Sequence, residues 1–319
     1  MTGKTAVLVY DTIHGRVLTR LEEKFELIRV RRGVPPSISP EDAERVKGAA
    51  IFGAFGADWI DLLPNLEIIA HFGVGYDGVD CAAAARRGII VTNTPDVLND
   101  EVADSAVALL LNTIHQIPRV ERWLRSGDWA EKGSCPLSPM SIKGRTVGLY
   151  GLGRIGIEIA RRLEPFKVKI AYHTRSKREG VDYAHYPTLL ALAEAVDTLI
   201  CIVPGTPETH KAINAEVLKA LGPNGVFINV GRGTSVDEDA LIEALNAKTL
   251  AAAGLDVFYD EPKVPQGLLD AENAVLWPHI ASATVPTRDA MGDLVVDNII
   301  RWFAEGKTLT PVPETPAPV

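Results

Sequence analysis

The stretch that decides the fold runs from Val147 to Gly156 and reads Val-Gly-Leu-Tyr-Gly-Leu-Gly-Arg-Ile-Gly. Its first four residues predict a buried strand, and a helical pattern follows. Gly151 permits a tight turn, Gly153 lets the backbone approach a pyrophosphate, and Gly156 lets the helix pack closely on its strand. The helix N-terminus favours an anion. A glycine-rich turn can also occur without a ligand, but the flanking strand and helix favour a dinucleotide site at Gly151, Leu152, Gly153, Arg154, Ile155 and Gly156.

The strand expected next, Lys169–His173, ends without the acid that usually holds the ribose 2′-hydroxyl of NAD about 20 residues after the glycine turn. Cations and hydroxyls stand there instead, and these would bind a 2′-phosphate. A solvated basic loop is the alternative interpretation. The sequence therefore predicts that NADPH is preferred and NAD is possible, with cofactor contacts at Thr174, Arg175, Ser176 and Lys177 beside a further cation, Arg178.

Short apolar runs alternate with helical patterns along the whole chain, once over residues 6–92 and again over residues 146–277. Runs without polar alternation are typical of parallel strands buried on both faces. The repeated strand–helix–strand pattern predicts an α/β fold with two doubly wound parallel-sheet domains, a Rossmann cofactor domain and a flavodoxin-like substrate domain.

Two long helical patterns, Asp100–Ile117 and Thr287–Glu305, lie where the chain would pass between these domains. The second pattern is long enough to return to the first domain. We therefore expect a discontinuous substrate domain of residues 1–98 plus 288–319 and a dinucleotide-binding domain of residues 99–287. A loop is expected at Gly127–Pro139, which is rich in glycine and proline.

Composition excludes several classes of function. The 319 residues carry a net charge of −8, which gives no global attraction for nucleic acid or anionic membranes. No apolar run approaches the roughly 18 residues of a membrane span. The three cysteines, 81, 135 and 201, lie far apart, which argues against disulfides and fits a reducing cytoplasm. The histidines show no metal-ligand spacing, so no catalytic metal is expected. With nucleic acid and membranes disfavoured, the predicted partner is a small molecule.

Three polar motifs follow strands of the second set, at the sheet edge where doubly wound folds bind ligands. They contain Arg232, Glu261 and His279. An arginine can orient a keto acid, and a histidine can deliver a proton near neutral pH. A carboxylate paired with that histidine holds its tautomer. Each residue alone could be structural, but their joint placement predicts a catalytic trio.

These motifs and the stretch His-Phe-Gly-Val-Gly-Tyr-Asp at residues 71–77 resemble the D-isomer-specific 2-hydroxyacid dehydrogenase family over essentially the whole chain. Within the family, the chain is similar to the glyoxylate/hydroxypyruvate reductase branch. The resemblance implies that Arg232 binds substrate, that His279 is the acid and base with Glu261 as its partner, and that the backbone amides of Val74 and Gly75 hold the substrate carboxylate.

The resemblance also implies further contacts to the cofactor from residues at the ends of strands. Among them, the Asp256 side chain would contact the nicotinamide amide. The implied set is Val203, Pro204, Thr209, Val230, Gly231, Arg232 and Asp256.

The implied activity is NADPH-dependent reduction of glyoxylate, hydroxypyruvate or a related small 2-keto acid to a D-2-hydroxy acid. A homodimer through the apolar helix Ala103–Ile117 is also implied, and Trp129 lies in a loop of the kind that can cover a partner's pocket. One alternative is a bulkier substrate of the 2-ketogluconate or hydroxyphenylpyruvate type, decided near Phe52–Phe55, Trp129 and the Cys135–Met140 loop. Another is a dinucleotide-sensing binding protein on the same fold, against which the intact trio argues.

Overall fold

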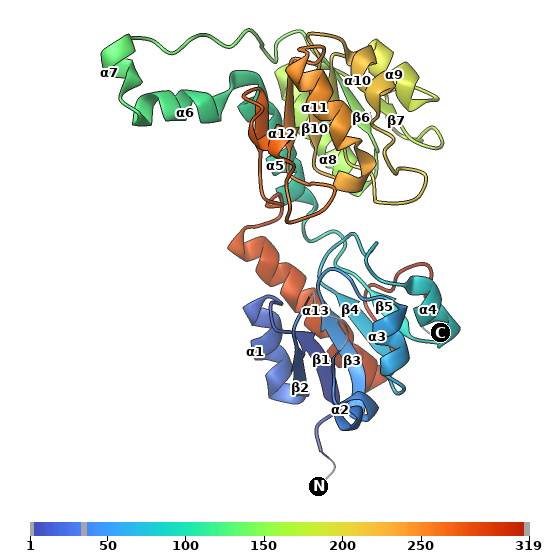
Figure 1. Ribbon diagram of the computed structural model, residues 1–319. Coiled ribbons are helices and arrows are strands. Elements are labelled where there is room, and N and C mark those ends of the chain that lie inside the picture. Colours follow the sequence, from blue (N-terminus) through green and yellow to red (C-terminus); the bar gives the residue numbers. More distant parts are fainter. Residues whose placement is uncertain (1–2, 33–36, 316–319) are drawn as a thin grey trace. The chain divides into compact units, whose positions relative to one another are not determined.

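In a computed structural model, which describes residues 3–32 and 37–315, the chain forms two compact units (Figure 1). Unit 1 consists of Met1–Leu98 and Ala283–Val319, and unit 2 consists of Asn99–Ser282. The return to unit 1 lies five residues before the expected boundary at 287/288. Residues 1–2 and 316–319 of the expected substrate domain lie outside the described residues.

Unit 1 is built on a five-stranded sheet with the order β2-β1-β3-β4-β5. All neighbouring strands are parallel. The order reverses between β1 and β3, which makes this the flavodoxin-like form of a doubly wound sheet. The strands are β1 (Ala6–Tyr10), β2 (Glu26–Val30), β3 (Val46–Ile51), β4 (Ile68–His71) and β5 (Ile90–Thr92).

Helices cover both faces of this sheet. The buried side chains of α2 (Pro40–Arg45), α3 (Ala57–Leu62) and α4 (Cys81–Arg86) share one core with the strands. On the other face, α1 (Gly15–Lys24) packs against α13 (Val285–Glu305), which also contacts β3 and β4. Arg16 and Arg20 of α1 bind Asp293 of α13 at 2.6 and 2.8 Å. Helix α13, far along the chain, is therefore part of the first unit and forms one layer together with α1.

The segment after α13 extends the same sheet at its β5 edge. Thr92 and Pro311 form an antiparallel bridge, and the Val312 amide donates to the Val91 carbonyl at 2.9 Å. The Val91 amide in turn donates to the Thr315 hydroxyl at 2.8 Å. The described end of the chain thus satisfies backbone groups that an edge strand would leave open.

Unit 2 is built on a seven-stranded sheet with the order β12-β11-β10-β9-β6-β7-β8, again with every neighbouring pair parallel. The order reverses between β6 and β9, as in a Rossmann fold, so the predicted fold class is confirmed. The strands are β6 (Thr146–Tyr150), β7 (Lys169–His173), β8 (Ala184–His185), β9 (Thr198–Cys201), β10 (Val226–Asn229), β11 (Ala252–Leu255) and β12 (Ala274–Leu276).

Two hydrophobic cores flank this sheet. One contains buried residues of α5 (Asn99–His115) and α8 (Arg154–Leu163). The other contains buried residues of four further helices, which are α9 (Leu189–Ala195), α10 (Ala215–Leu221), α11 (Glu238–Asn246) and α12 (Gln266–Leu269). Short 3₁₀ turns lie at Glu164–Phe166 and Gly233–Ser235. The sheet is buried on both faces, as its continuous apolar runs indicate.

The helix expected at Asp100–Ile117 ends earlier than the pattern suggests. Gln116 adopts a left-handed backbone conformation (φ 55°), which ends α5 at His115. A second helix, α6 (Ile117–Arg125), begins directly after it. Pro118 lies in the first turn of α6, where a missing N–H costs no hydrogen bond. The apolar stretch is therefore interrupted by a turn.

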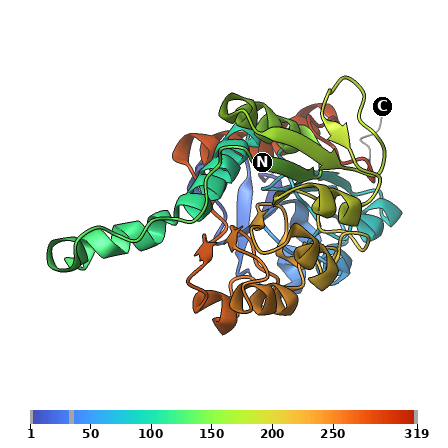
Figure 2. The ribbon, with the colours of Figure 1, turned by 90° about the horizontal axis from the view of Figure 1, so that it is seen from above.

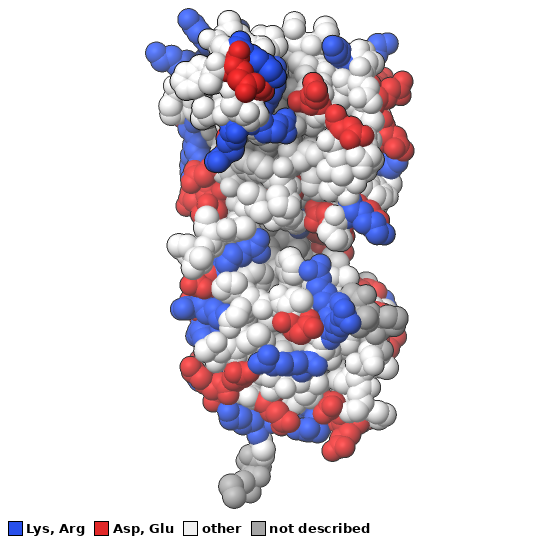
Figure 3. Space-filling model, turned by 60° about the vertical axis from the view of Figure 1, so that its left-hand side comes forward, with Lys and Arg blue, Asp and Glu red and all other residues white. Residues whose placement is uncertain are grey.

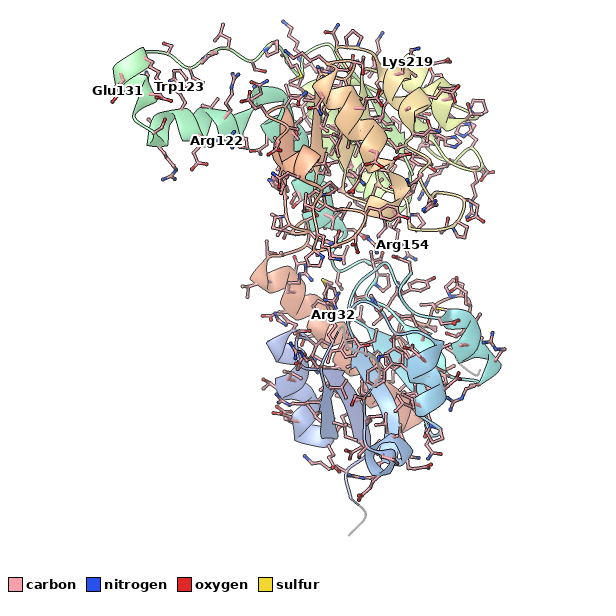
Figure 4. All side chains as sticks on the ribbon, viewed as in Figure 1. Arg32, Arg122, Trp123, Glu131, Arg154 and Lys219 are labelled. Atoms are coloured by element: carbon pink, nitrogen blue, oxygen red, sulfur yellow. The ribbon has the colours of Figure 1, made fainter. Side chains whose placement is uncertain are left out.

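The loop expected at Gly127–Pro139 contains a short helix, α7 (Asp128–Lys132). An ion pair between Asp128 and Lys132 (2.8 Å) links residues one helical turn apart, which supports this helix against its glycine-rich surroundings. Figure 2 shows α6 and α7 extending well away from the sheet of unit 2. In Figure 4, Arg122, Trp123 and Glu131 mark this projecting arm.

On the face of the molecule that Figure 3 shows, neither positive nor negative side chains form a broad region of their own. Figure 3 shows Lys and Arg scattered among Asp and Glu over both units. Among the described helices, none combines the length and the hydropathy needed to cross a membrane.

Candidate active site

The glycine turn lies at the carboxyl end of β6, as its sequence predicts. Gly151 has a φ of 101°, which favours glycine, and a Cβ there would meet the Ile202 carbonyl at 2.9 Å. A Cβ on Gly156 would meet the Gly151 carbonyl at 2.5 Å, so the helix packs closely on the turn. Gly153 is exposed, has open space around it, and precedes the first residue of α8. The first-turn amides of α8 can therefore receive an anion.

The helix after the turn, α8, begins at Arg154, so its first turn already includes the last residues of the glycine motif. Leu152 is buried, and Ile155 packs against the core of unit 2. Arg154 is exposed at the edge of unit 2 seen in Figure 4. Arg154 carries the one exposed side chain of this stretch, and the backbone at Gly153 is open to solvent, as a phosphate-binding turn requires.

The basic loop after β7 divides into two parts. Arg178 is anchored, because its guanidinium donates to the Leu152 carbonyl and its amide donates to the Tyr172 hydroxyl at 2.9 Å. The Thr174 hydroxyl donates to the Ser176 carbonyl at 2.7 Å, which closes the turn. The exposed side chains of Arg175 and Lys177 are therefore the cations available to a 2′-phosphate. Arg175 also helps to lower the pKa of Glu208, which is lowered chiefly by a hydrogen bond from Thr206.

The backbone of Arg232 is clamped by two buried side chains. Asn229 donates from its amide nitrogen to the Arg232 carbonyl (3.0 Å) and accepts from the Gly231 amide (3.0 Å). The Ser235 hydroxyl donates to the same Arg232 carbonyl at 2.6 Å. Both Asn229 and Ser235 have no exposed surface. Arg232 is therefore held rigidly just beyond β10, and its guanidinium also donates to the Gly231 carbonyl at 2.8 Å.

Gly231 and Gly233 let this turn pass between two neighbouring segments. A Cβ on Gly231 would lie 2.8 Å from the Val203 carbonyl, and one on Gly233 would overlap the Phe258 carbonyl carbon at 1.9 Å. Only glycine fits at Gly233, because backbone atoms cannot move aside as a flexible side chain can. The turn that carries Arg232 is thus pressed against the segment that leads to Glu261.

Glu261 and His279 form the central pair of the site. His279 Nδ1 lies 2.7 Å from Glu261 Oε2, and the other carboxylate oxygen of Glu261 accepts from the Phe258 amide at 3.0 Å. An ionised Glu261 can only accept, so Nδ1 carries a proton and Nε2 is left for chemistry. The His279 side chain is 44% exposed, which leaves that nitrogen reachable. The backbone of His279 has a φ of 54°, an uncommon conformation often found at functional positions.

Burial raises the pKa of Glu261. This effect is outweighed by the hydrogen bond and charge of His279, by the hydrogen bond from the Phe258 amide and by the charge of Arg232. The pKa of Glu261 therefore lies below its ordinary value. The charge of Arg232 thus acts on the same carboxylate. The structure therefore brings the three residues of the predicted trio together within unit 2.

Asp256 holds the turn on which His279 lies. Its backbone carbonyl accepts from the His279 amide at 2.8 Å. Its carboxylate oxygens accept from the amides of Ile280 (2.7 Å) and Ala281 (3.0 Å). Asp256 is 1% exposed, and burial raises the pKa of its carboxyl against these amides and the charge of His279. The structure thus assigns Asp256 a positioning role that the sequence does not reveal.

The other strand-end residues expected near the cofactor lie at the carboxyl ends of β9 and β10. Val203 and Val230 are buried, and the Val230 amide donates to the Cys201 carbonyl at 3.1 Å. Pro204 is exposed. The Thr209 hydroxyl donates to the Pro204 carbonyl at 2.6 Å and accepts from the Thr206 backbone amide at 2.9 Å. Thr209 therefore fixes the shape of the loop after β9.

Val74 and Gly75 lie in unit 1, in the turn that follows β4. In the part of the chain that the structure describes, neither backbone amide donates a hydrogen bond, and both residues are partly exposed. Two free adjacent amides can bind a carboxylate. The described residues contain no cluster of three His, Cys, Asp or Glu side chains that could hold a metal ion.

Sequence reasoning missed Asn229, Ser235 and Asn93, which hold the predicted functional residues by hydrogen bonds. The signal for Asn229 and Ser235 is present but weak, since each flanks Arg232 by three residues on either side of a Gly-Arg-Gly turn. Asn93 follows β5 and donates to the Val74 carbonyl at 2.8 Å. Its link to Val74 is set by tertiary structure and has no local pattern.

Residues 107–281, which lie within unit 2, match the model of a family described as D-isomer specific 2-hydroxyacid dehydrogenase, NAD binding domain. The chain is 44% identical over 310 residues to glyoxylate/hydroxypyruvate reductase A of Arabidopsis thaliana, covering 96% of this chain and 98% of that protein. It is 45% identical over 276 residues to hydroxyphenylpyruvate reductase of Plectranthus scutellarioides, covering 86% and 87% of the two chains.

A solved structure matches almost the whole chain. It is the crystal structure of an NADPH-dependent glyoxylate/hydroxypyruvate reductase from Sinorhizobium meliloti in complex with NADP and malonate. The two chains are 57% identical, the TM-score is 0.97, and the match covers 99% of each.

The lowered pKa of Glu261 predicts a pH dependence of stability. Because folding favours the ionised carboxylate, its stabilising contribution is complete above the unfolded-state pKa of about 4.3 and is lost as pH falls through the lower folded-state pKa. The free energy of unfolding, measured in urea, should therefore fall less steeply below about pH 4.3 in Glu261→Gln than in the unaltered chain. Glu305→Gln, which alters an exposed ion pair with Arg301, is the matched control. Parallel curves for Glu261→Gln and the unaltered chain would contradict the role of the pair.

Proposed function

Because the chain belongs to the D-isomer specific 2-hydroxyacid dehydrogenase family, we propose that it reduces small 2-keto acids such as glyoxylate and hydroxypyruvate, with NADPH, to D-2-hydroxy acids. The observation that carries this proposal is the pairing of His279 with Glu261 at 2.7 Å beside Arg232. Such a trio can bind a keto acid, hold a proton and deliver it to a developing alkoxide.

In this proposal, each residue has a distinct task. The Arg232 guanidinium binds the keto oxygen and polarises it. His279 holds a proton on Nε2 and passes it to that oxygen. Throughout this step, Nδ1 stays hydrogen-bonded to Glu261. Glu261 thereby keeps the imidazole in one orientation and stabilises its charged form. Bound NADPH supplies the hydride that reduces the keto carbon.

The backbone amides of Val74 and Gly75 are assigned to the substrate carboxylate, because they are adjacent and donate to no other described group. A small acid suits this assignment, since two amides and one arginine satisfy a carboxylate and a keto oxygen without further polar groups. The assignment is also supported by the place of Val74 and Gly75 in the stretch of residues 71–77, which resembles the family.

The residues of unit 2 fit NADPH. The exposed backbone at Gly153 and the first turn of α8 suit the pyrophosphate, and Arg175 and Lys177 suit a 2′-phosphate. The remaining assignments to the cofactor are Leu152, Arg154, Ile155, Thr174, Ser176, Val203, Pro204, Thr209, Val230, Gly231, Arg232 and Asp256. The homologue from Sinorhizobium meliloti, which is bound to NADP, supports this choice.

A bulkier 2-keto acid is the second candidate substrate, because the chain is 45% identical to a hydroxyphenylpyruvate reductase. The same trio would act on either substrate, since the side group of the keto acid takes no part in the chemistry. A panel of 2-keto acids with each cofactor distinguishes these possibilities from a protein that only binds dinucleotide.

We expect glyoxylate and hydroxypyruvate to give the highest kcat/KM in this panel, with NADPH at least about ten times better than NADH because charged groups meet the 2′-phosphate. Arg175→Ala with Lys177→Ala should remove that preference and leave the NADH kinetics unchanged. Lys219→Ala removes an exposed charge at the edge of unit 2 opposite Arg154 in Figure 4 and serves as the control. A preference for hydroxyphenylpyruvate would support the second candidate, and binding without turnover would support a sensor.

Replacing the proposed acid, His279→Gln, should lower kcat by roughly 10²–10⁴-fold, because a positioned general acid contributes about that factor. The Kd for NADPH, measured by fluorescence titration, should stay unchanged, since His279 is not assigned to the cofactor. His210→Gln alters a histidine that contacts the Tyr259 hydroxyl at 3.0 Å and is the matched control. A kcat within a few-fold of the unaltered enzyme would remove His279 from the mechanism.

We also propose a homodimer formed through α5 and the projecting arm of α6 and α7. The arm exposes large apolar side chains, with Leu124 57% and Trp129 62% exposed. Such side chains favour burial against a partner. Light scattering of the purified protein should give twice the mass of one chain, and Leu124→Lys with Trp129→Lys should weaken the dimer. A monomer at micromolar concentration would contradict it.

A reducing compartment such as the cytoplasm is proposed as the location. Cys81, Cys135 and Cys201 are free thiols, and unpaired cysteines are common where disulfides do not persist.

A further inference from the structure

The turn after β4 has an unequal pattern of hydrogen bonds. The carbonyl groups of Gly73 and Val74 accept hydrogen bonds from protein donors, while the amides of Val74 and Gly75 donate to no described group. The Gly73 carbonyl accepts from the Thr94 amide at 3.0 Å, and the Val74 carbonyl accepts from Asn93 Nδ2 at 2.8 Å. The protein therefore holds one side of this turn and leaves the other side to a ligand.

The peptide bonds that join Gly73, Val74 and Gly75 are trans. In a trans peptide the N–H of one residue points opposite to the C=O of the residue before it. A donor that binds the Val74 carbonyl therefore fixes the direction of the Gly75 N–H. In the same way, the donor on the Gly73 carbonyl fixes the direction of the Val74 N–H.

His71 takes part on the Gly73 side. Its Nε2 accepts from the Gly53 amide at 3.3 Å, and its Nδ1 lies 3.4 Å from the Gly73 carbonyl. The first contact requires a free lone pair on Nε2, so Nδ1 carries the proton and donates. The Gly73 carbonyl is thus held by a backbone amide and an imidazole. By contrast, Asn93 Nδ2 is the single donor to the Val74 carbonyl in the described part of the chain.

Asn93 is itself held by the C-terminal segment. The backbone amide of Asn93 donates to the Thr310 carbonyl at 3.3 Å, and the Thr310 hydroxyl donates to the backbone carbonyl of Asn93 at 2.7 Å. The fully buried Asn298 of α13 donates to the Thr310 hydroxyl at 2.9 Å and accepts from its amide at 3.1 Å. A continuous series of hydrogen bonds therefore runs from α13 to the Val74 carbonyl.

We infer that Asn93 is a positioning residue for substrate binding, which orients the Gly75 amide toward the substrate carboxylate by holding the Val74 carbonyl. This inference rests on the proposed assignment of that amide to the carboxylate. Asparagine suits the task because it is a neutral donor on a short side chain. An aspartate would offer no donor and would repel the carboxylate.

The test is Asn93→Leu, which keeps the shape of the side chain and removes the donor. The KM for glyoxylate should rise about 10-fold, the loss expected when one hydrogen bond to a charged group is misdirected. The inhibition constant of malonate, a dicarboxylate probe, should rise by a similar factor. The KM for NADPH should stay unchanged and kcat should change little, because Asn93 touches neither the cofactor site nor the trio.

Asn65→Leu is the matched control, since Asn65 Nδ2 donates to the Glu44 carbonyl at the same 2.8 Å elsewhere in unit 1. A merely structural role for Asn93 would lower Tm and the active fraction without changing either constant. Unchanged KM and unchanged malonate inhibition in a folded Asn93→Leu enzyme would overturn the inference.

Failure of the proposed function gives a different result. If the unaltered protein reduces no 2-keto acid, the proposed function fails, and binding of malonate is then read from the rise in Tm that it causes. A rise in the unaltered protein and in Asn65→Leu, but not in Asn93→Leu, supports the inference without any turnover. No rise in the unaltered protein, or an equal rise in all three, overturns it.

Discussion

The carboxylate of Asp256 accepts hydrogen bonds from two successive backbone amides, those of Ile280 and Ala281, while its own carbonyl accepts from His279. Asp256 thus accepts three hydrogen bonds that together fix a short turn, and the first residue of this turn, His279, has a positive φ. A buried carboxylate is costly to leave unpaired, so these bonds must form together with the core around them. The orientation of His279 toward Glu261 follows from that turn.

The same construction recurs at the other proposed functional groups. The backbone of Arg232 is held by Asn229 and Ser235, and the turn after β4 is held by Asn93. In each case a neutral polar side chain, hydrogen-bonded to the backbone, fixes a charged or hydrogen-bonding group of the candidate site. The groups proposed to react are therefore positioned before a ligand arrives, and such positioning lowers the entropic cost of binding and of catalysis.

The sequence predicts much of the fold because the deciding signals are local. Continuous apolar strands and the glycine turn indicate two doubly wound sheets, and both are present. The interruption at Gln116 was missed, because a left-handed residue before an N-terminal proline leaves no change in the apolar pattern. The sequence names Glu261 and His279 as candidate site residues because they belong to motifs, and the structure places their side chains in contact. The supporting role of Asp256 depends on hydrogen bonds to residues 24 and 25 positions further along the chain, so no local sequence pattern indicates it.

The discontinuity of unit 1 bears on how the chain folds as it is made. Unit 2 is one contiguous segment, so all of its strands have been synthesised before α13 appears. Unit 1 has its five strands early but lacks both α13, which covers one face of the sheet together with α1, and the segment that pairs with β5. On the ribosome, its apolar face and open edge must therefore wait through the synthesis of the whole of unit 2, which is the interval in which a chaperone would protect them.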